Sequence, residues 1–149
     1  MQTMQADISI RSRDGTQVAV VELKNPRNLT GEAARLYRRE MIVHGVLPQM
    51  PFFLLLSQDV GYLWKDARPE TPDAPPTIEF SMGNVIERYL TVPPGHRLIE
   101  IELEIVIVQW LGDLAAGLEL PTQEPDKTLA AVGFIDAIRG ASVVPEAAA

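Results

Sequence analysis

The chain has 149 residues, of which 46% are hydrophobic and 22% charged, and this is the composition of one globular domain with room for a core. It contains no cysteine, which excludes disulfides and thiolate-bound metals, and its net charge of -7 argues against broad non-specific nucleic-acid binding while leaving a local basic patch open. No apolar run reaches the ~18 residues of a membrane span and the N-terminus lacks a signal-peptide pattern, so we expect a single cytoplasmic domain over residues 1–144, with no membrane association and a disordered tail at 145–149.

The first predicted element is a β-hairpin. Two β-type runs, near residues 6–12 and 16–24, flank the turn signal Asp14-Gly15. A two-residue loop at this dipeptide would pair Arg13 with Thr16, so that the numbers of paired residues sum to 29. A four-residue loop from Arg13 to Thr16 gives the same register.

This register makes a geometric prediction about three charged side chains. Asp7 lies opposite Glu22, and directly opposed residues have Cβ atoms about 5 Å apart on one face. Lys24 projects from the same face, with Val18 and Val20 below it, because side chains alternate along a strand. Two carboxylates and an ammonium group are therefore expected at one end of an apolar strand face.

The rest of the chain predicts an alternation of helices and strands. We expect a helix near 31–44, capped by Thr30, then a buried strand near 50–56 and a fourth strand at 62–65. A proline-rich loop at 66–76 precedes helices near 81–90, capped by Ser81, and near 127–139. Residues 97–118 fit both a strand alternation and a helical stripe, and their length favours a helix with possible β character before Glu104.

This order of elements predicts an α/β fold. A right-handed crossover from the second strand through the first helix places the third strand parallel to the second. We therefore expect a mixed four-stranded sheet, made of the N-terminal hairpin and two further strands and flanked by helices.

The hairpin and the elements that follow it resemble the PD-(D/E)XK nuclease superfamily, which has the restriction-endonuclease-like fold. The core of the resemblance is Asp7 with Glu22-Leu23-Lys24, followed by a helix and an apolar strand. A wider set of runs is similar to uncharacterised bacterial proteins of that superfamily: Val20-Val21-Glu22-Leu23-Lys24-Asn25, Tyr37-Arg38-Arg39, His44-Gly45-Val46-Leu47-Pro48, Pro51-Phe52-Phe53-Leu54-Leu55, Tyr62-Leu63-Trp64-Lys65 and Trp110-Leu111.

The resemblance implies a metal-dependent nuclease, acting on DNA as the first choice. Asp7 and Glu22 would bind Mg²⁺ or Mn²⁺, the backbone carbonyl of Leu23 would add a ligand, and Lys24 would orient or activate the attacking water. The chemistry is consistent, because Mg²⁺ takes hard oxygen ligands, retains waters, and lowers the pKa of a bound water.

One departure from the superfamily keeps other interpretations open. Members usually carry a helix before the first motif strand, often with a further acidic residue, and only six residues precede Asp7 here. The C-terminal helix or a partner subunit could cover that face. The alternatives are a cross-strand ion network on an exposed hairpin, a catalytically silent binding or assembly module, and a homo-oligomer with an interface in the apolar stretch at 98–118.

The predicted helix at 31–44 carries the remaining candidates. Arg35, Arg38 and Arg39 cluster on one side and form either a solvated face, with Glu32 and Glu40 as partners, or a phosphate-contacting patch for nucleic acid. Tyr37 fits the core, with an accessory role at the metal site as the alternative.

Overall fold

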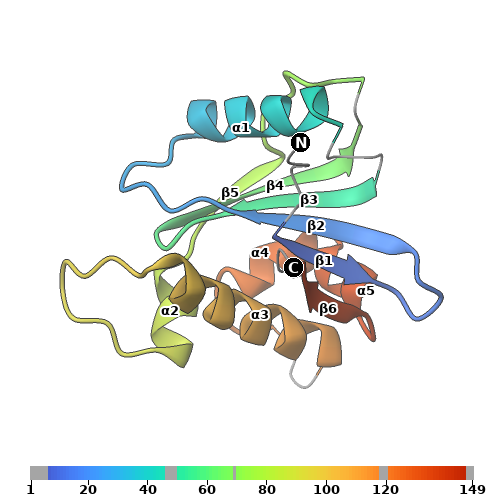
Figure 1. The fold of residues 1–149 in the computed structure, drawn as a ribbon. Helices are drawn as coiled ribbons and strands as arrows, with labels where there is room; N and C mark the ends of the chain where they lie inside the picture. Colours follow the sequence, from blue (N-terminus) through green and yellow to red (C-terminus); the bar gives the residue numbers. More distant parts are fainter. Residues whose placement is uncertain (1–6, 46–49, 69, 118–120, 147–149) are drawn as a thin grey trace.

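The computed structural model describes residues 7–45, 50–68, 70–117 and 121–146, and over this part the chain is an α/β protein (Figure 1). Its sheet has six strands in the order β5-β4-β3-β2-β1-β6. The strands are β1 (Ile8–Arg11), β2 (Gln17–Leu23), β3 (Met50–Leu56), β4 (Val60–Ala67), β5 (Ile78–Ser81) and β6 (Ser142–Pro145). The helices are α1 (Gly31–Val43), α2 (Gly83–Tyr89), α3 (Glu100–Ala116), α4 (Asp126–Ala131) and α5 (Phe134–Ile138).

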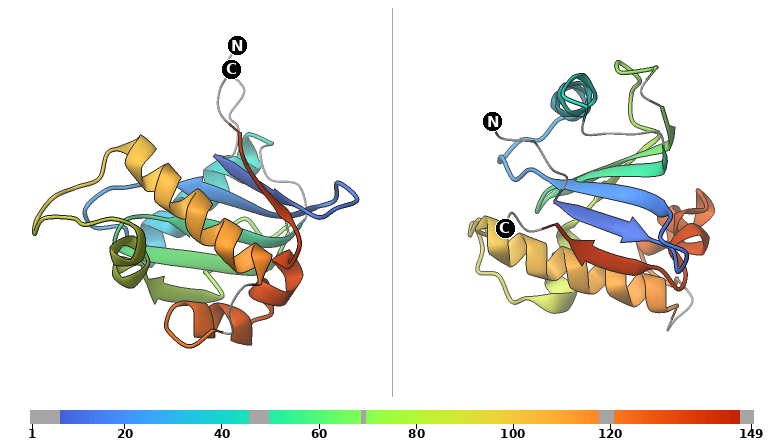
Figure 2. Two further views of the ribbon diagram at one scale, coloured as in Figure 1. Left: turned by 90° about the horizontal axis from the view of Figure 1, so that it is seen from below. Right: turned by 45° about the vertical axis from the view of Figure 1, so that its right-hand side comes forward.

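Helices cover both faces of the sheet, which makes three layers (Figures 1 and 2). Helix α1 lies on one face, above a small core that includes Val20, Phe53 and Trp64. The other four helices lie on the opposite face and enclose the larger core, to which β1 contributes Ile8 and Ile10. Alternate residues of β2 therefore face different layers, so Val20 and Glu22 point to the α1 side.

The hairpin has the predicted register but not the predicted loop. Ile8 pairs with Val21 and Ile10 with Ala19, which confirms the sum of 29. The predicted pairing of Arg13 with Thr16 is wrong, because Arg11 pairs with Gln17 and the loop spans residues 12–16. A β-bulge between the pair of Arg11 and the pair of Ile10 adds one extra residue on β2. From Ile10 toward the start of β1, the pairs therefore have the predicted register.

The bulge also changes the position of one predicted side chain. Val18 joins the larger core with Ala19 and Val21, whereas Val20 belongs to the core under α1. The expectation that Val18 and Val20 share the face of Glu22 is therefore wrong for Val18. Side chains of β2 alternate between the two faces of the sheet from Lys24 back to the bulge, and the extra residue there breaks the alternation.

The crossover prediction is confirmed, but the sheet is wider than the expected four strands. Strands β2 and β3 are parallel, with Ala19 opposite Phe52, and α1 connects them. Strand β5 replaces the start of the predicted helix at 81–90, so Ser81 ends a strand instead of capping a helix. Strand β6 forms after the last predicted helix and reaches into the predicted tail, a region for which the sequence indicated no strand. Both strands are four residues long, too short to show a period.

The C-terminal half confirms one helix and divides another. Helix α3 covers most of 97–118, which settles the conflict there in favour of a helix. The predicted helix at 127–139 is interrupted by Gly133, whose φ of 88° is left-handed, and it becomes α4 and α5.

The ordered chain extends beyond residue 144. Pro145 ends β6, and the backbone N–H of Glu146 donates to the carbonyl of Asp7 at 2.9 Å. The start of the predicted tail is therefore wrong, while 147–149 lie outside the described residues. Within the described residues, no helix has both the length and the apolar character needed to cross a bilayer.

Gly61, on β4, gives a stability prediction. A Cβ at this position would lie 2.6 Å from Cζ of Phe80 and 2.8 Å from Cδ2 of Leu56, and both side chains are buried. We expect Gly61→Ala to lower the free energy of unfolding by about 1–3 kcal/mol, because the packed sheet must shift to admit the methyl group. Urea denaturation measures this loss.

Gly112 provides the matched control. It lies inside α3, and a Cβ there would meet nothing within 4 Å. Gly112→Ala is expected to stabilise the protein by about 0.5–1 kcal/mol through helix propensity alone. The same sign of change in both variants would contradict the packing argument for Gly61.

Candidate functional site

The structure brings the three predicted residues of the hairpin together at the C-terminal end of β2. Asp7 directly precedes β1, and its Oδ2 accepts a hydrogen bond of 2.8 Å from the backbone N–H of Leu23. Lys24 follows β2, and its Nζ lies 3.6 Å from Oε1 of Glu22. The register arithmetic therefore places these side chains correctly, although the loop that joins the strands differs.

Glu22 is the unusual member of this group. The residue is only 6% exposed, and its Oε2 atom is buried with no hydrogen-bond partner. Burial, followed by the charge of Asp7 and a hydrogen bond with it, raises the pKa of Glu22 to about 8, against a smaller opposite effect of Lys24. A buried carboxylate with an unpartnered oxygen is costly, and either a proton or a cation at this oxygen would reduce the cost.

Lys24 is held between a carboxylate and an aromatic ring. Its Nζ lies 5.4 Å from the ring centroid of Tyr37, which projects from α1. The ammonium group thus has a cation–π contact in addition to Glu22. Tyr37 is 36% exposed, so it lies at the margin of the site and not deep in the core.

Open space adjoins Lys24. A cavity of about 240 Å³ is lined by Leu23, Lys24, Asn25, Glu100 and Leu103. The wall is rigid at Asn25, whose side chain accepts from the backbone N–H of Gln58 at 2.9 Å and donates to the carbonyl of Leu98 at 3.0 Å. These two bonds connect the end of β2 to the segment before α3 and to the turn after β3. The residues around the space beside Lys24 are therefore held in place by hydrogen bonds.

The three arginines of α1 have different roles in the structure. Arg38 is 1% exposed and donates to the carbonyls of Thr71 at 2.8 Å and Arg68 at 3.0 Å. It therefore holds the loop after β4 onto α1. Arg35 and Arg39 lie on the surface and pair with one carboxylate, Asp73, at 2.9 and 2.7 Å. Binding of nucleic acid stays a prediction for these two.

The donor set fits a hard divalent cation. Asp7 and Glu22 offer carboxylate oxygens, one of them buried and unpartnered, and the carbonyl of Leu23 is the predicted third ligand. No group of three or more Asp, Glu or His side chains converges on a metal position anywhere in the described residues. An ion at this pair would therefore keep several waters, which is the usual state of Mg²⁺ in proteins.

Two acidic residues near the site were missed by sequence reasoning. Glu100, at the start of α3, lines the cavity beside Lys24. Glu146 follows β6 and lies next to Asp7. No local pattern identifies either residue, because each reaches the site through a contact more than 70 residues away along the chain.

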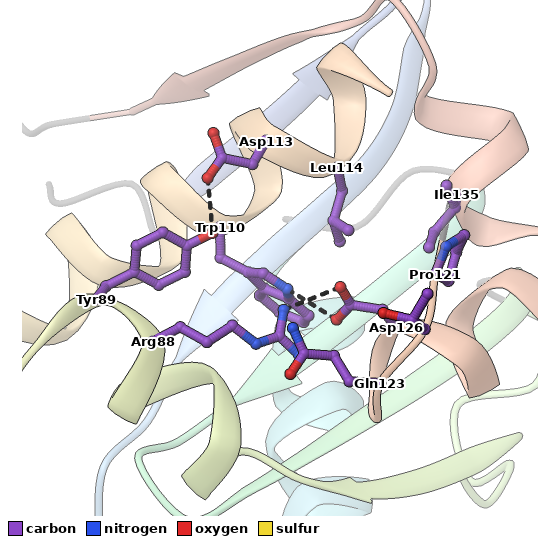
Figure 3. Close-up of a pocket in the computed structure, with 10 residues that line it drawn as sticks. Arg88, Tyr89, Trp110, Asp113, Leu114, Pro121, Gln123, Asp126 and Ile135 are labelled. Carbon is purple, nitrogen blue, oxygen red and sulfur yellow. Dashed lines mark hydrogen bonds and ion pairs between the residues drawn. The ribbon is translucent and has the colours of Figure 1, made fainter. Parts of the chain in front are cut away.

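A second cavity of about 240 Å³ lies between α2, α3, α4 and α5 (Figure 3). Its polar wall is an ion pair, with Nη1 of Arg88 at 2.9 Å from Oδ2 of Asp126, and Trp110 donates to the same carboxylate at 3.2 Å. No predicted site residue lines this cavity. Trp110 belongs to the core on the opposite face of the sheet from Glu22, so the two places are distinct.

No protein-family model, curated protein or solved structure matches the chain.

Proposed function

We propose that the chain is a metal-dependent phosphodiesterase of the PD-(D/E)XK type, with DNA as the favoured substrate. The observation that carries the proposal is the buried, unpartnered Oε2 of Glu22 beside Asp7, with Lys24 at 3.6 Å. A purely structural pair with Lys24 gives no reason for this arrangement, because it leaves a buried polar oxygen without a hydrogen-bond partner, which is costly whether or not the carboxyl is charged.

The arrangement of the elements supports the restriction-endonuclease-like core. The acid-bearing strands β1 and β2, the crossover α1 and the parallel β3 follow the expected order. Helix α3 packs against the face of the hairpin that carries Ile8 and Ile10, and β6 adds a strand beside β1 (Figure 2). The C-terminal part of the described chain therefore covers this face and edge of the hairpin, which supports the expectation that a C-terminal helix could do so.

Each residue then has a defined task. Asp7, Glu22 and the carbonyl of Leu23 would hold Mg²⁺ or Mn²⁺, which when bound lowers the pKa of a water and stabilises charge on the phosphate. Lys24 places a positive charge where that water and the phosphate meet. Tyr37 restrains the ammonium group of Lys24, and Arg35 and Arg39 offer surface charge to a phosphate backbone.

Lys24→Ala tests the hydrolytic part of the proposal. Labelled DNA and RNA, each single- and double-stranded, are incubated with the protein and Mn²⁺. We expect the variant to lose about 100-fold or more of the cleavage rate, because removal of a group that assists proton transfer typically costs that much. Lys127→Ala, at an exposed lysine of α4, is the control and should cleave normally. Equal cleavage by wild type and Lys24→Ala would reject hydrolysis at this site.

The alternative is a nuclease-fold module for binding or assembly that cuts nothing. The observation in its favour is an apolar surface around the start of α3, where Ile99, Ile101 and Ile105 are 62%, 53% and 59% exposed. Calorimetry with Mn²⁺ separates the two functions, because tight binding that is lost in Glu22→Gln opposes a purely structural role. A clean monomer in light scattering would argue against assembly through this surface.

A further inference from the structure

The cavity between α2, α3, α4 and α5 has a wall that is held in place by hydrogen bonds from α2 (Figure 3). Asn84 and Arg88 both donate to the backbone carbonyl of Glu124, at 2.6 and 3.0 Å. Arg88 also pairs with Asp126, at the start of α4. These bonds attach the segment before α4 to α2, so the cavity has fixed walls on that side.

Three charged side chains line this cavity, and they do not balance. Nη1 of Arg88 lies 2.9 Å from Oδ2 of Asp126, so these two charges offset each other. The third is Asp113, which accepts a hydrogen bond of 2.7 Å from the neutral phenol of Tyr89 and makes no ion pair with a described residue. With one positive and two negative side chains, the lining favours a cationic ligand over an anionic one.

The hydroxyl of Tyr89 holds the Asp113 carboxylate at the margin of the cavity. Burial, followed by the hydrogen bond with Asp113, raises the pKa of Tyr89 well above its usual value, so the phenol keeps its proton and remains the donor. This bond uses one of about four acceptor positions of the carboxylate. An ammonium group at Asp113 would therefore find free acceptor positions, and it would lie close to the aromatic ring of Tyr89 (Figure 3).

The remaining wall is largely apolar, and the volume limits the size of a ligand. Pro121 and Ile135 lie on the side of the cavity away from Tyr89, and Leu114 of α3 also lines it (Figure 3). An apolar group placed against these side chains is removed from water, which favours binding. The cavity measures about 240 Å³, less than the roughly 300–1,000 Å³ of sites for drug-sized ligands. A ligand with an apolar body of about one ring fits this space.

We propose that this cavity binds a small organic cation, namely a free primary amine that carries an apolar body of about one ring. The ammonium group contacts Asp113 beside the ring of Tyr89, and the body lies against the apolar wall. This inference goes beyond the proposed function and does not depend on it, because the cavity and Glu22 belong to opposite faces of the sheet.

The indole N–H signals of the two tryptophans in a nuclear magnetic resonance titration test the proposal. Trp110 lines the cavity, whereas Trp64 lies in the core under α1 and serves as an internal control. Addition of 2-phenylethylammonium should shift the Trp110 signal and leave Trp64 unchanged. 2-Phenylethanol has the same body without the charge and should bind about tenfold more weakly or less, because it lacks a charge-assisted hydrogen bond. The anion 3-phenylpropionate should shift neither signal.

Asp113→Asn tests the carboxylate directly. The amide keeps an oxygen that can accept from Tyr89 but carries no charge, so we expect the amine to bind about tenfold more weakly and the alcohol to bind as before. Asp113 is exposed, and an unchanged circular dichroism spectrum would verify the fold. Glu87→Gln removes the same charge from an exposed residue of α2 that does not line the cavity, and it should match the wild type.

Several results would overturn the inference. An unshifted Trp110 signal rejects binding of the amine, and equal affinities for the amine and the alcohol reject recognition by charge. Wild-type affinity in Asp113→Asn rejects the role of this carboxylate. n-Butylammonium has the chain of a lysine side chain and should bind more weakly, because it covers less of the apolar wall. If it bound as tightly as 2-phenylethylammonium, the occupant would be a lysine of a partner protein and not a free amine of this class.

Discussion

Replacing Glu22 with glutamine is expected to stabilise the metal-free protein at pH 8 and to abolish its stabilisation by Mn²⁺. Burial and Asp7 raise the pKa of Glu22 from its ordinary value of 4.5 to about 8, so the folded state prefers the protonated carboxyl. An amide has the shape of that protonated group and carries no charge. We expect a gain of about 2–3 kcal/mol at pH 8, or about 5–10 °C in melting temperature.

The sign of this effect depends on pH in a defined way. Because the folded pKa lies above the unfolded one, the stability contributed by Glu22 is fully present below about pH 4.5. It is lost progressively as the pH rises to about 8. The difference between Glu22→Gln and wild type should therefore be small at pH 4.5 and largest at pH 8 and above. Melting curves of metal-free protein across this range, with Glu87→Gln as control, measure it.

With saturating Mn²⁺ in the same experiment, we expect wild type to be more stable than Glu22→Gln, which is the opposite order. A ligand that binds only the folded state at 1,000 times its dissociation constant adds about 4.1 kcal/mol to the stability, which exceeds the gain expected for Glu22→Gln. Wild type should gain this from Mn²⁺ and Glu22→Gln should not, so saturating metal reverses their ranking. A variant that is less stable at pH 8 and responds to Mn²⁺ like wild type would identify Glu22 as a member of a structural ion pair with Lys24.

The part of the site that the sequence predicts is the part that local pairing determines. The positions of Asp7, Glu22 and Lys24 follow from the alternation of a hairpin, and the register is fixed because a slip by one residue would expose Ile8 and Ile10. The loop could not be predicted, because a tight turn and a longer turn with a bulge give the same register. The α/β class and the parallel crossover are predictable for the same reason, since they depend on long, strongly patterned segments.

The parts that the sequence does not predict depend on contacts distant along the chain. Glu146 acquires its place only when β6 pairs with β1, and four residues at the edge of a sheet carry no periodic signal. Arg38 has the sequence context of a surface arginine, yet the loop after β4 folds over it and accepts its hydrogen bonds. Short strands and buried charges are decided by tertiary partners, and their own residue types give little indication of them.

Asp126→Ala is expected to cause the largest loss of stability among the polar substitutions considered. Asp126 is 8% exposed, and it accepts from Arg88 at 2.9 Å and from the indole N–H of Trp110 at 3.2 Å (Figure 3). Removing it leaves a guanidinium group and an indole N–H without this partner inside the layer of α2, α3 and α4. Breaking a buried pair from one side typically costs about 3–5 kcal/mol, which urea denaturation would detect as a lower midpoint.

A double-mutant cycle shows whether the cost comes from the stranded charge. Arg88→Met in the Asp126→Ala background removes that charge, so the double variant should be more stable than Asp126→Ala alone by about 1–3 kcal/mol. Asp136→Ala is the control, because its pair with Arg139 is exposed and should contribute below about 0.5 kcal/mol. Equal losses in Asp126→Ala and Asp136→Ala would contradict the argument from burial. The Mn²⁺ affinity of a folded Asp126→Ala protein should be unchanged, since this ion pair and Glu22 belong to opposite faces of the sheet.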